Sequence, residues 1–203
     1  MKFKLKRQKA NKSLLDICSS IIKKNEIDVP RAGPKIVKGL PPILKEIEER
    51  GLPSSFVIKK LKGKLGYGVF LHPKAAPILK GTPIAPYAGE VILRPQHEED
   101  DSDYTFSLVS GFHLTREEQK RWDPNRPYHP RRLYSIDLDA EKVGNFTRFI
   151  NHSESPNIEA HFLKTSPFPF ELIYVAKKTI LPGEQLLVCY EGEDKSYWGA
   201  LKI

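Results

Sequence analysis

Hydrophobic side chains in the first part of the chain recur at the spacing of an amphipathic helix. Ser13 can cap this helix, with Asp16 as its partner three residues on. The apolar stripe that follows consists of Leu14, Leu15, Ile17, Cys18, Ile21 and Ile22. A second helix is expected to begin at Pro41–Pro42 and to end at Gly51, because proline suits a first helical turn and glycine a C-cap. We therefore expect residues 1–54 to form a short helical extension.

From residue 55 the pattern changes to short apolar runs of the kind that form strands. Turn residues separate the runs, and no long helical pattern alternates with them, which argues against a doubly wound α/β fold. The segment Arg94–Asp103 is expected to be a surface loop. The sequence predicts a mostly β domain of small sheets over residues 55–203. The expected strands are Phe56–Lys60, Val69–Leu71, Pro83–Tyr87, Tyr104–Leu108, Tyr134–Asp137, Ile158–Phe162, Glu171–Ala176 and Gln185–Val188.

The composition is that of a globular protein, with 39% hydrophobic and 10% aromatic residues among 203. No apolar run approaches the roughly 20 residues of a membrane span. The basic first residues have no apolar signal segment directly behind them, so we expect a soluble protein made in a cytosol, with export by another route left open. Cys18 and Cys189 cannot supply a disulfide framework or a four-cysteine zinc site, and we expect reduced, mostly buried thiols.

The net charge of +8 is unevenly distributed. Residues 1–64 contain 17 Lys or Arg and 6 Asp or Glu, a balance of +11, whereas the remaining residues contain 16 and 19, a balance of −3. A basic front part attracts nucleic acid, an acidic protein or anionic lipid. A solvated lysine-rich surface explains the charge equally well, so the charge alone does not decide between a binding face and a solvated one.

Three segments of the second part carry candidate chemistry. Gly66-Tyr67-Gly68 is a glycine-rich turn, but Leu71 stands where a dinucleotide fingerprint needs its third glycine, and no helix follows. Arg148–Asn157 places the polar Asn151 and His152 in a short turn behind apolar residues. Ala176–Tyr190 contains a Pro-Gly turn that leads into a strand ending at the tyrosine. Each segment taken alone has an ordinary structural explanation.

Hydrolytic and metal-dependent chemistry gain no support from these segments. The chain has no Gly-x-Ser-x-Gly sequence, and a Cys189–His152 nucleophile pair has no supporting local signature. His152 and His161 lack obvious companion ligands for a metal ion. We therefore expect no resident metal.

Taken in this order, the segments resemble the SET-domain protein lysine methyltransferases. The resemblance covers roughly residues 56–198. The residues that carry it are Gly66-Tyr67-Gly68-Val69-Phe70, Tyr87-Ala88-Gly89-Glu90, Tyr104-Thr105-Phe106, Arg148-Phe149-Ile150-Asn151-His152-Ser153 with Pro156-Asn157, and Gly183-Glu184 leading to Tyr190. The resemblance implies small β-sheets around a knot-like core, with the cofactor on one face and the lysine entering from the other through an aromatic channel.

The resemblance also implies roles for individual residues. Tyr190 matches the active-site tyrosine, Tyr87 matches a tyrosine of the channel wall, and His152 joins them as a catalytic residue. The residues implied to bind S-adenosylmethionine are Leu65, Gly66, Tyr67, Gly68, Tyr104, Arg148, Asn151, His152 and Trp198. For Gly66 and Gly68 the missing side chain would allow close approach of the cofactor. The residues expected to be structural hydrogen-bonders are Glu90, Ser153, Asn157 and Glu184.

The chain departs from the family's pattern in three places. The zinc-binding cysteine cluster that follows many SET domains is missing, and Tyr197-Trp198 could either close the site by stacking on the adenine or pack as a plain C-terminal tail. Val188 stands where the family often has an aromatic residue, and Ala160 stands where some members have another channel tyrosine. Small residues at both positions predict room for more than one methyl group on the lysine.

The expected substrate is a lysine of a histone or histone-like protein, because the sequence resembles compact bacterial SET proteins, including those of chlamydia-like intracellular bacteria. The same resemblance implies a soluble protein of a bacterial cytoplasm, with secretion into a host cell and its nucleus as a further possibility. Contact with nucleic acid or chromatin would run through the basic N-terminal part. The rival hypothesis is a SET-fold module that binds chromatin or nucleic acid without catalysis. Methylation of a non-histone protein, or of the chain itself, is the other alternative.

Overall fold

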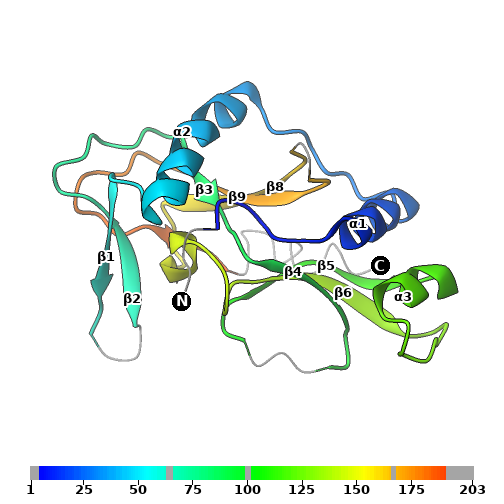
Figure 1. The fold of residues 1–203 in the computed structure, drawn as a ribbon. Coiled ribbons are helices and arrows are strands. Elements are labelled where there is room, and N and C mark those ends of the chain that lie inside the picture. The colour runs from blue at the N-terminus through cyan, green and yellow to red at the C-terminus, as the bar shows by residue number, and fades with distance from the viewer. Residues whose placement is uncertain (1–4, 63–65, 99–101, 166–167, 191–203) are drawn as a thin grey trace.

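The computed structural model describes residues 5–62, 66–98, 102–165 and 168–190 (Figure 1). Along the chain, its elements are α1 (Lys12–Lys24), α2 (Pro34–Arg50), β1 (Phe56–Lys60), β2 (Tyr67–Leu71), β3 (Pro83–Pro86), β4 (Glu90–Pro95), β5 (Thr105–His113), α3 (Arg116–Trp122), β6 (Leu133–Asp139), the 3-10 turn η2 (Phe146–Phe149), β7 (Asn151–His152), β8 (Ile158–Leu163), β9 (Glu171–Ala176) and β10 (Leu187–Val188).

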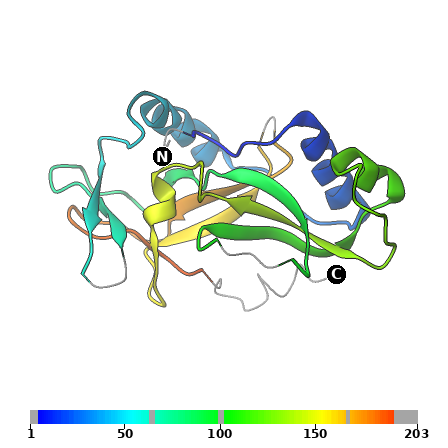
Figure 2. The ribbon, with the colours of Figure 1, turned by 60° about the horizontal axis from the view of Figure 1, so that its bottom comes forward.

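The strands form four small sheets, as the short apolar runs predict. β1 and β2 make an antiparallel hairpin at one end of the molecule, while the two three-stranded sheets have the orders β3-β9-β8 and β4-β6-β5 (Figures 1 and 2). β7 and β10 form a short parallel pair. Every expected strand overlaps an observed one, so the mostly β prediction is confirmed. The knot-like crossing stays a prediction.

The first helix, α1, packs one face into the main hydrophobic core. Ile17, Cys18 and Ile21 are almost completely buried there, and each such isoleucine contributes about 1.5–3 kcal/mol relative to an exposed side chain. The predicted cap at Ser13 is wrong. Asn11 caps the helix instead, because its side chain accepts the backbone N–H of Leu14 at 2.8 Å.

The second helix, α2, begins earlier than the sequence predicts. It starts at Pro34 behind Gly33, and the Pro41–Pro42 pair lies inside it. The rule that proline suits a first helical turn therefore holds for Pro34, and the predicted start at residue 41 is wrong. The predicted end is confirmed, since Gly51 takes the left-handed conformation with φ 81°. Buried side chains of α2 and of the β8–β9 hairpin form a second core cluster, made by Leu40, Leu44, Leu163, Ile173 and Val175.

Strand β4 was missed by the sequence prediction. It runs through Arg94 to Pro95, so the first part of the expected loop Arg94–Asp103 is strand. Its apolar run is flanked by charged residues. Only its pairing with β6 along its whole length shows that this segment is a strand. The N-terminal segment adds to this sheet edge: Lys9 donates to Gly89 O at 2.8 Å and accepts from the N–H of Val91 at 2.9 Å.

The N-terminal segment before α1 also reaches the central sheet. Arg7 forms an ion pair with Glu171 at the start of β9, and the Gln8 side chain donates to Phe170 O at 2.9 Å. Helices α1 and α2 contribute Ile17, Ile21 and Ile47 to the same core cluster as the strands. The helical extension and the β domain therefore share one hydrophobic core.

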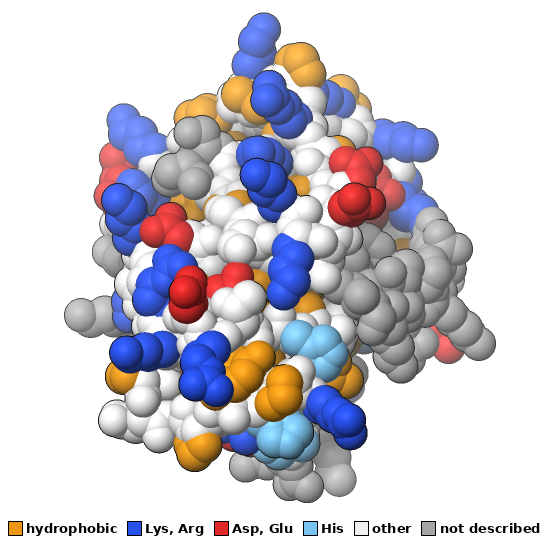
Figure 3. Space-filling view, turned by 90° about the vertical axis from the view of Figure 1, so that its right-hand side faces the viewer, with side chains coloured by type: hydrophobic (Ala, Val, Ile, Leu, Met, Phe, Trp, Pro, Cys, Tyr) orange, Lys and Arg blue, Asp and Glu red, His pale blue; other side chains and the backbone are white. Residues whose placement is uncertain are grey.

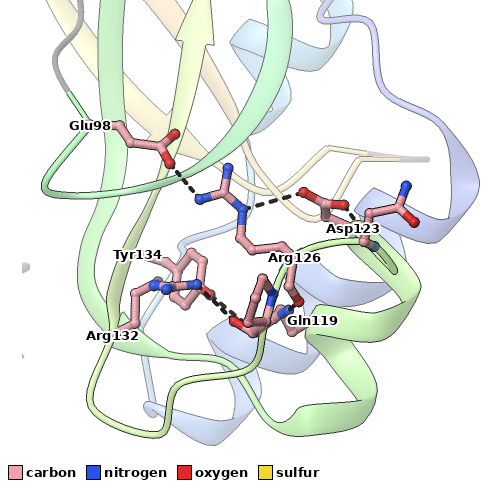
Figure 4. Close-up of polar contacts among 8 residues, drawn as sticks. Glu98, Gln119, Asp123, Arg126, Arg132 and Tyr134 are labelled. Carbon is pink, nitrogen blue, oxygen red and sulfur yellow. Dashed lines mark hydrogen bonds and ion pairs between the residues drawn. The ribbon is translucent and has the colours of Figure 1, made fainter.

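A polar network holds α3 and the loop behind it against the β4–β6–β5 sheet (Figure 4). Arg126 forms ion pairs with Glu98 and Asp123, and its carbonyl accepts the Gln119 side chain. Gln119 in turn lies 3.5 Å from the hydroxyl of the buried Tyr134 on β6. These contacts fix the far end of the β5–β6 hairpin, whose near end lines the candidate site.

Neither Cys18, which is buried, nor Cys189, which is half-buried, forms a disulfide in the described part of the chain, and burial raises the pKa of the Cys18 thiol to about 12. None of the helices in the described ranges is long and apolar enough to cross a membrane. Within the same ranges, no three His, Cys, Asp or Glu side chains are grouped so that they could hold a metal ion.

Candidate active site

The parallel pair β7–β10 joins two segments that are distant in sequence. Leu187 pairs with Asn151 and Val188 with His152, and the N–H of Ser153 donates to Val188 O at 2.9 Å. The chain enters β7 from η2, which Asn145 caps by accepting the N–H of Thr147. The Asn-His-Ser segment and the end of the chain's last described strand thus lie side by side.

Tyr190 is fixed to this pair by both ends of the residue. Its backbone N–H donates to Nδ1 of His152 at 3.1 Å, and its hydroxyl donates to the carbonyl of Ile150 at 2.7 Å. The rings of His152 and Tyr190 lie 5.4 Å apart between centroids. Tyr190 as a whole is 44% exposed, but its ring lines a cavity, and burial there raises the pKa of the hydroxyl. The structure therefore brings His152 and Tyr190 together.

The cavity beside Tyr190 has a volume of about 250 Å³ and mostly aromatic walls. Its lining residues are Gly66, Tyr67, Tyr87, Asp103, Tyr104, Thr105, Phe106, Arg148, Phe149, Ile150, Asn151, Tyr174 and Tyr190. Most of the residues that the sequence assigns to the site are among them. Gly68 and His152 are not on this wall, and Leu65 and Trp198 lie outside the described residues.

Tyr87 follows directly on β3 and is almost buried, with 7% exposure. Its hydroxyl donates to the carbonyl of Tyr104 at 2.7 Å, and its N–H donates to Leu172 O at 2.8 Å. Burial, with a smaller contribution from the neighbouring Tyr190, raises the pKa of Tyr87 well above its ordinary value. Tyr87 therefore stays protonated and is a rigid wall of the cavity.

Arg148 provides a buried positive charge at the cavity. Its guanidinium carbon lies 3.8 Å from the centre of the Tyr104 ring, and the group donates to the carbonyls of Ala140 and, at 2.7 Å, Glu141. These contacts fix the guanidinium group at the cavity wall.

The two glycines of the Gly66-Tyr67-Gly68 turn have different surroundings. Gly66 has φ +63° and open space where a side chain would begin, which fits close approach of a ligand. At Gly68 a Cβ would lie 2.7 Å from the Gln185 side chain and 3.1 Å from that of Leu61. Packing inside the protein therefore accounts for Gly68, whereas Gly66 faces the cavity.

Two asparagines hold the segments in place. The side chain of Asn151 donates to Tyr67 O at 2.9 Å and links β7 to the glycine-rich turn. The side chain of Asn157 donates to Gln185 O and accepts from the N–H of Leu187, both at 2.8 Å, and so clamps β10. The other expected hydrogen-bonders form local bonds too: Lys9 to Glu90, the N–H of Ser155 to Ser153, and the N–H of Leu181 to Glu184.

Tyr174, Thr105 and Phe106 line the cavity but were not assigned to the site from the sequence. Tyr174 lies in the middle of β9, where every residue is buried. Because a strand buried on both faces has no polar alternation, its sequence does not show which side chains face a cavity. Thr105 and Phe106 belong to the Tyr-Thr-Phe segment, in which only Tyr104 had been singled out.

Comparison with known proteins shows the family of the chain. A family model described as the SET domain matches residues 66–191. The chain belongs to the SET-domain family. A curated relative, the histone-lysine N-methyltransferase SETMAR of Mus musculus, is 28% identical over 120 residues. That match covers 57% of the chain and 34% of the mouse protein, so the chain spans about a third of this relative's length.

Two solved structures share the fold of this SET-domain protein. ATXR5 in complex with histone H3.1 mono-methylated on R26 has a TM-score of 0.65 at 16% identity, covering 94% of this chain and 82% of that one. The ATXR5 SET domain in complex with histone H3 di-methylated on R26 has a TM-score of 0.59 at 19% identity, covering 85% and 73%. At these identities the likeness establishes the SET fold.

Proposed function

We propose that this SET-domain protein is a protein-lysine N-methyltransferase that uses S-adenosylmethionine and acts on a histone or histone-like protein. One observation carries the proposal: Tyr190, bonded to His152 and Ile150, lines an aromatic cavity of about 250 Å³ in a chain of the SET family. The curated relative, named a histone-lysine N-methyltransferase, supports the same class of activity.

The cavity fits the chemical character of S-adenosylmethionine. The aromatic ring of Tyr67 at the cavity wall suits a positively charged sulfur. Arg148 suits a carboxylate, and the open space at Gly66 leaves room next to the backbone. When bound, this cofactor supplies a methyl group on a positively charged sulfur, and the lysine nitrogen takes the carbon while the carbon–sulfur electron pair stays with the sulfur. Asn151 and Tyr104 are the other described residues that we propose to hold it.

The residues of the chain have three tasks in this reaction. The aromatic walls exclude water and so favour the neutral form of the lysine amine, which alone has a free electron pair. The hydroxyl of Tyr190, held 2.7 Å from Ile150 O, places two oxygen atoms at one point of the wall, where they can contact a polarised methyl group. Tyr87 narrows the channel and aligns the amine within reach of that methyl.

Histones are the proposed substrate class. Both ATXR5 structures are complexes with histone H3, and this supports a histone-like substrate for a chain with the same fold. The proposal also includes basic proteins that resemble histones, because the lysine channel itself contacts only one side chain of the substrate. The alternative substrates are the chain's own lysines and lysines of non-histone proteins. Mass mapping of the labelled lysines distinguishes these alternatives from a histone.

The decisive experiment measures transfer of labelled methyl groups from S-adenosylmethionine to a panel of histones and other basic proteins. We expect incorporation into at least one of them, and a loss of about 10²-fold or more in Tyr190→Phe, as for other removed transition-state contacts. Tyr128→Phe, which removes a tyrosine hydroxyl near α3, is the matched control and keeps full activity. A folded wild-type protein that binds no S-adenosylmethionine and labels nothing contradicts the proposal and leaves the non-catalytic binding module.

We also propose that the basic N-terminal part contacts nucleic acid or chromatin. Lys and Arg predominate among the charged side chains on the side of the molecule that carries α1 and α3 (Figure 3). A hydrogen bond of 2.8 Å from Ser20 to Glu118 joins the two helices, so their cations share one face. The exposed basic residues of α1 and α3 are Lys12, Lys23, Lys24, Arg116, Lys120 and Arg121.

Binding of a labelled DNA duplex at rising salt tests this contact. In Lys23→Glu/Lys24→Glu we expect weaker binding. The slope of the logarithm of the binding constant against the logarithm of the salt concentration should become shallower by about 0.9 per lost phosphate contact. The same charge change at the exposed Lys74 and Lys178, outside the basic N-terminal part, is the control. Equal binding by both variants shows that this face is simply solvated.

We propose that the protein lies in a bacterial cytoplasm and is secreted into a host cell, because its sequence resembles compact bacterial SET proteins. Detection of a tagged protein in host-cell nuclei during infection tests it. Retention of the tag within the bacteria contradicts secretion.

A further inference from the structure

The N-terminal segment pairs with only part of the outer edge of β4. The N–H of Val91 donates to Lys9 O at 2.9 Å, on the side of β4 that faces away from β6. Because the direction of the backbone groups alternates along a strand, the N–H and C=O of Leu93 face this outer edge as well. The N-terminal segment does not reach Leu93, since the chain turns into α1 at its cap, Asn11. Within the described ranges, no hydrogen bond joins the backbone of Leu93 to another residue on this side.

A cavity of about 310 Å³ lies over this open edge. It is formed where the first turns of α1 and the end of α3, which lie side by side at one end of the molecule, meet β4 (Figures 1 and 2). Leu14, Ile17 and Trp122 provide apolar walls. Leu93 itself is only 2% exposed, and buried backbone groups are almost always paired. The edge therefore favours a ligand that has backbone groups of its own.

The charges at the cavity favour a carboxylate on that ligand. Arg121, at the end of α3, lines the cavity and is exposed, and it forms no ion pair within the described ranges. Glu90 lines the cavity too, but its carboxylate already pairs with the ammonium group of Lys9 at 3.2 Å. The charge that is left without a partner is therefore positive.

We propose that the open edge of β4 binds an extended, acidic peptide segment of a partner protein, which adds a short strand beside β4. The backbone of the segment pairs with Leu93, in line with the N-terminal segment of the chain. One apolar side chain enters between Leu14 and Trp122, and a carboxylate pairs with Arg121. In strand addition the backbone bonds give affinity and the side-chain pockets give specificity.

This site is separate from the candidate active site, because no residue lines both cavities. Nucleic acid is a poorer occupant of it. A phosphate group can pair with Arg121, but a nucleic-acid backbone has no alternating N–H and C=O groups to pair with the edge of a strand. The two classes of partner therefore differ in a property that a binding experiment can measure.

Fluorescence anisotropy of the full chain with labelled, acetylated peptides tests the inference. The probes have the sequence Glu-Val-x-Val-Glu, in which x is valine, isoleucine, leucine or phenylalanine in turn. We expect at least one of them to bind. Methylation of its amide nitrogens, one at a time, should weaken binding at alternate positions only, by about three- to tenfold for each backbone hydrogen bond lost. The amides that point away from β4 are the internal control.

A charge reversal in the protein tests the role of Arg121. In Arg121→Glu we expect binding to weaken about tenfold or more, as for a lost hydrogen bond between charged groups. A peptide with lysine in place of both glutamates should bind this variant better than the original peptide does. The matched control is Lys120→Glu, because Lys120 is the neighbouring exposed cation of α3 but does not line the cavity. Its binding should stay within about twofold of the wild type.

Three results would overturn the inference. If none of the peptides binds the folded wild type, the edge of β4 takes no added strand. If methylation of every amide has the same effect, the peptide is not held as a strand. If Lys120→Glu loses as much binding as Arg121→Glu, the peptide is attracted only by the basic face of α1 and α3. None of these results bears on the proposed methyl transfer, which is measured at a different site.

Discussion

The backbone N–H of Tyr190 donates a hydrogen bond to Nδ1 of His152 at 3.1 Å, although the two residues are 38 positions apart. A histidine nitrogen that accepts a hydrogen bond carries no proton, so the neutral ring has its proton on Nε2. The bond fixes the backbone of Tyr190 at the point where the chain leaves β10. Because the tyrosine hydroxyl is bonded to Ile150 O as well, both ends of the residue are held by the same segment of the chain.

Replacing His152 should therefore displace Tyr190. In His152→Ala we expect a loss of stability of about 0.5–1.5 kcal/mol, the contribution of one hydrogen bond, together with a large loss of methyl transfer. His152→Asn offers a side-chain oxygen as a replacement acceptor and should recover part of the activity. Urea unfolding and labelled-methyl incorporation measure the two effects. Full activity in folded His152→Ala would show that this bond does not position the tyrosine.

The clamp formed by Asn157 should matter for both stability and activity. Asn157→Asp replaces the donor to Gln185 O by an oxygen, so two acceptors face each other and the cost is about 1–3 kcal/mol. Loosening of β10 should lower methyl transfer per folded molecule as well. Asn25→Asp, which loses a comparable donor to Ile21 O at the end of α1, is the control. It should lose stability without losing activity per folded molecule.

Gly89, in the Tyr87–Glu90 segment, should tolerate no side chain. A Cβ there would lie 2.4 Å from Asp139 O and 2.7 Å from its carbonyl carbon, both in the backbone of β6. We expect Gly89→Ala to destabilise the protein by about 1–3 kcal/mol through overpacking, and to shift the neighbouring Tyr87. Gly33→Ala, where the Cβ meets nothing within 4 Å, is the control. Thermal unfolding of the two variants measures the difference. Equal unfolding midpoints would contradict the close approach of Gly89 to the backbone of Asp139.

The ion pair between Arg7 and Glu171 predicts a pH dependence of stability. Burial raises the pKa of Glu171 above its ordinary value of 4.5, and Arg7 opposes that rise. As the pH rises past 4.5 the unfolded chain releases its proton first, so rising pH favours unfolding until the folded group has also ionised. The free energy of unfolding of the wild type, relative to Glu171→Gln, should therefore fall across this window.

Arg7→Met should widen that window, because the arginine is the charge that lowers the pKa of Glu171. Its cost at neutral pH should stay below the ~3–5 kcal/mol of a broken, fully buried pair, since the Arg7 side chain is 27% exposed. Urea unfolding at a series of pH values measures both effects. Parallel curves for the wild type and Glu171→Gln would contradict a raised pKa at this carboxyl.

Local patterns in the sequence determined the class of the fold and most of its strands. Alternating or continuous apolar runs located the strands from β1 to β10 with the exception of β4 and β7, and Gly51 marked the end of α2. The start of each N-terminal helix was predicted wrongly, because Asn11 and Pro34 obey the same capping rules as the residues chosen. Local capping rules cannot choose between two residues that are equally suitable as the start of a helix, because the choice depends on how the helix packs.

The order of the motifs in the sequence also determined the family and most of the residues around the cavity. Only the tertiary structure decided that Tyr174, in the middle of β9, lines the cavity. It likewise showed that Gly68 serves packing while Gly66 faces the cavity. The physical reason is that strand pairing between distant parts of the chain decides which side chains face the cavity and which residues they contact. The residue types in a buried strand stay the same whichever face meets the site.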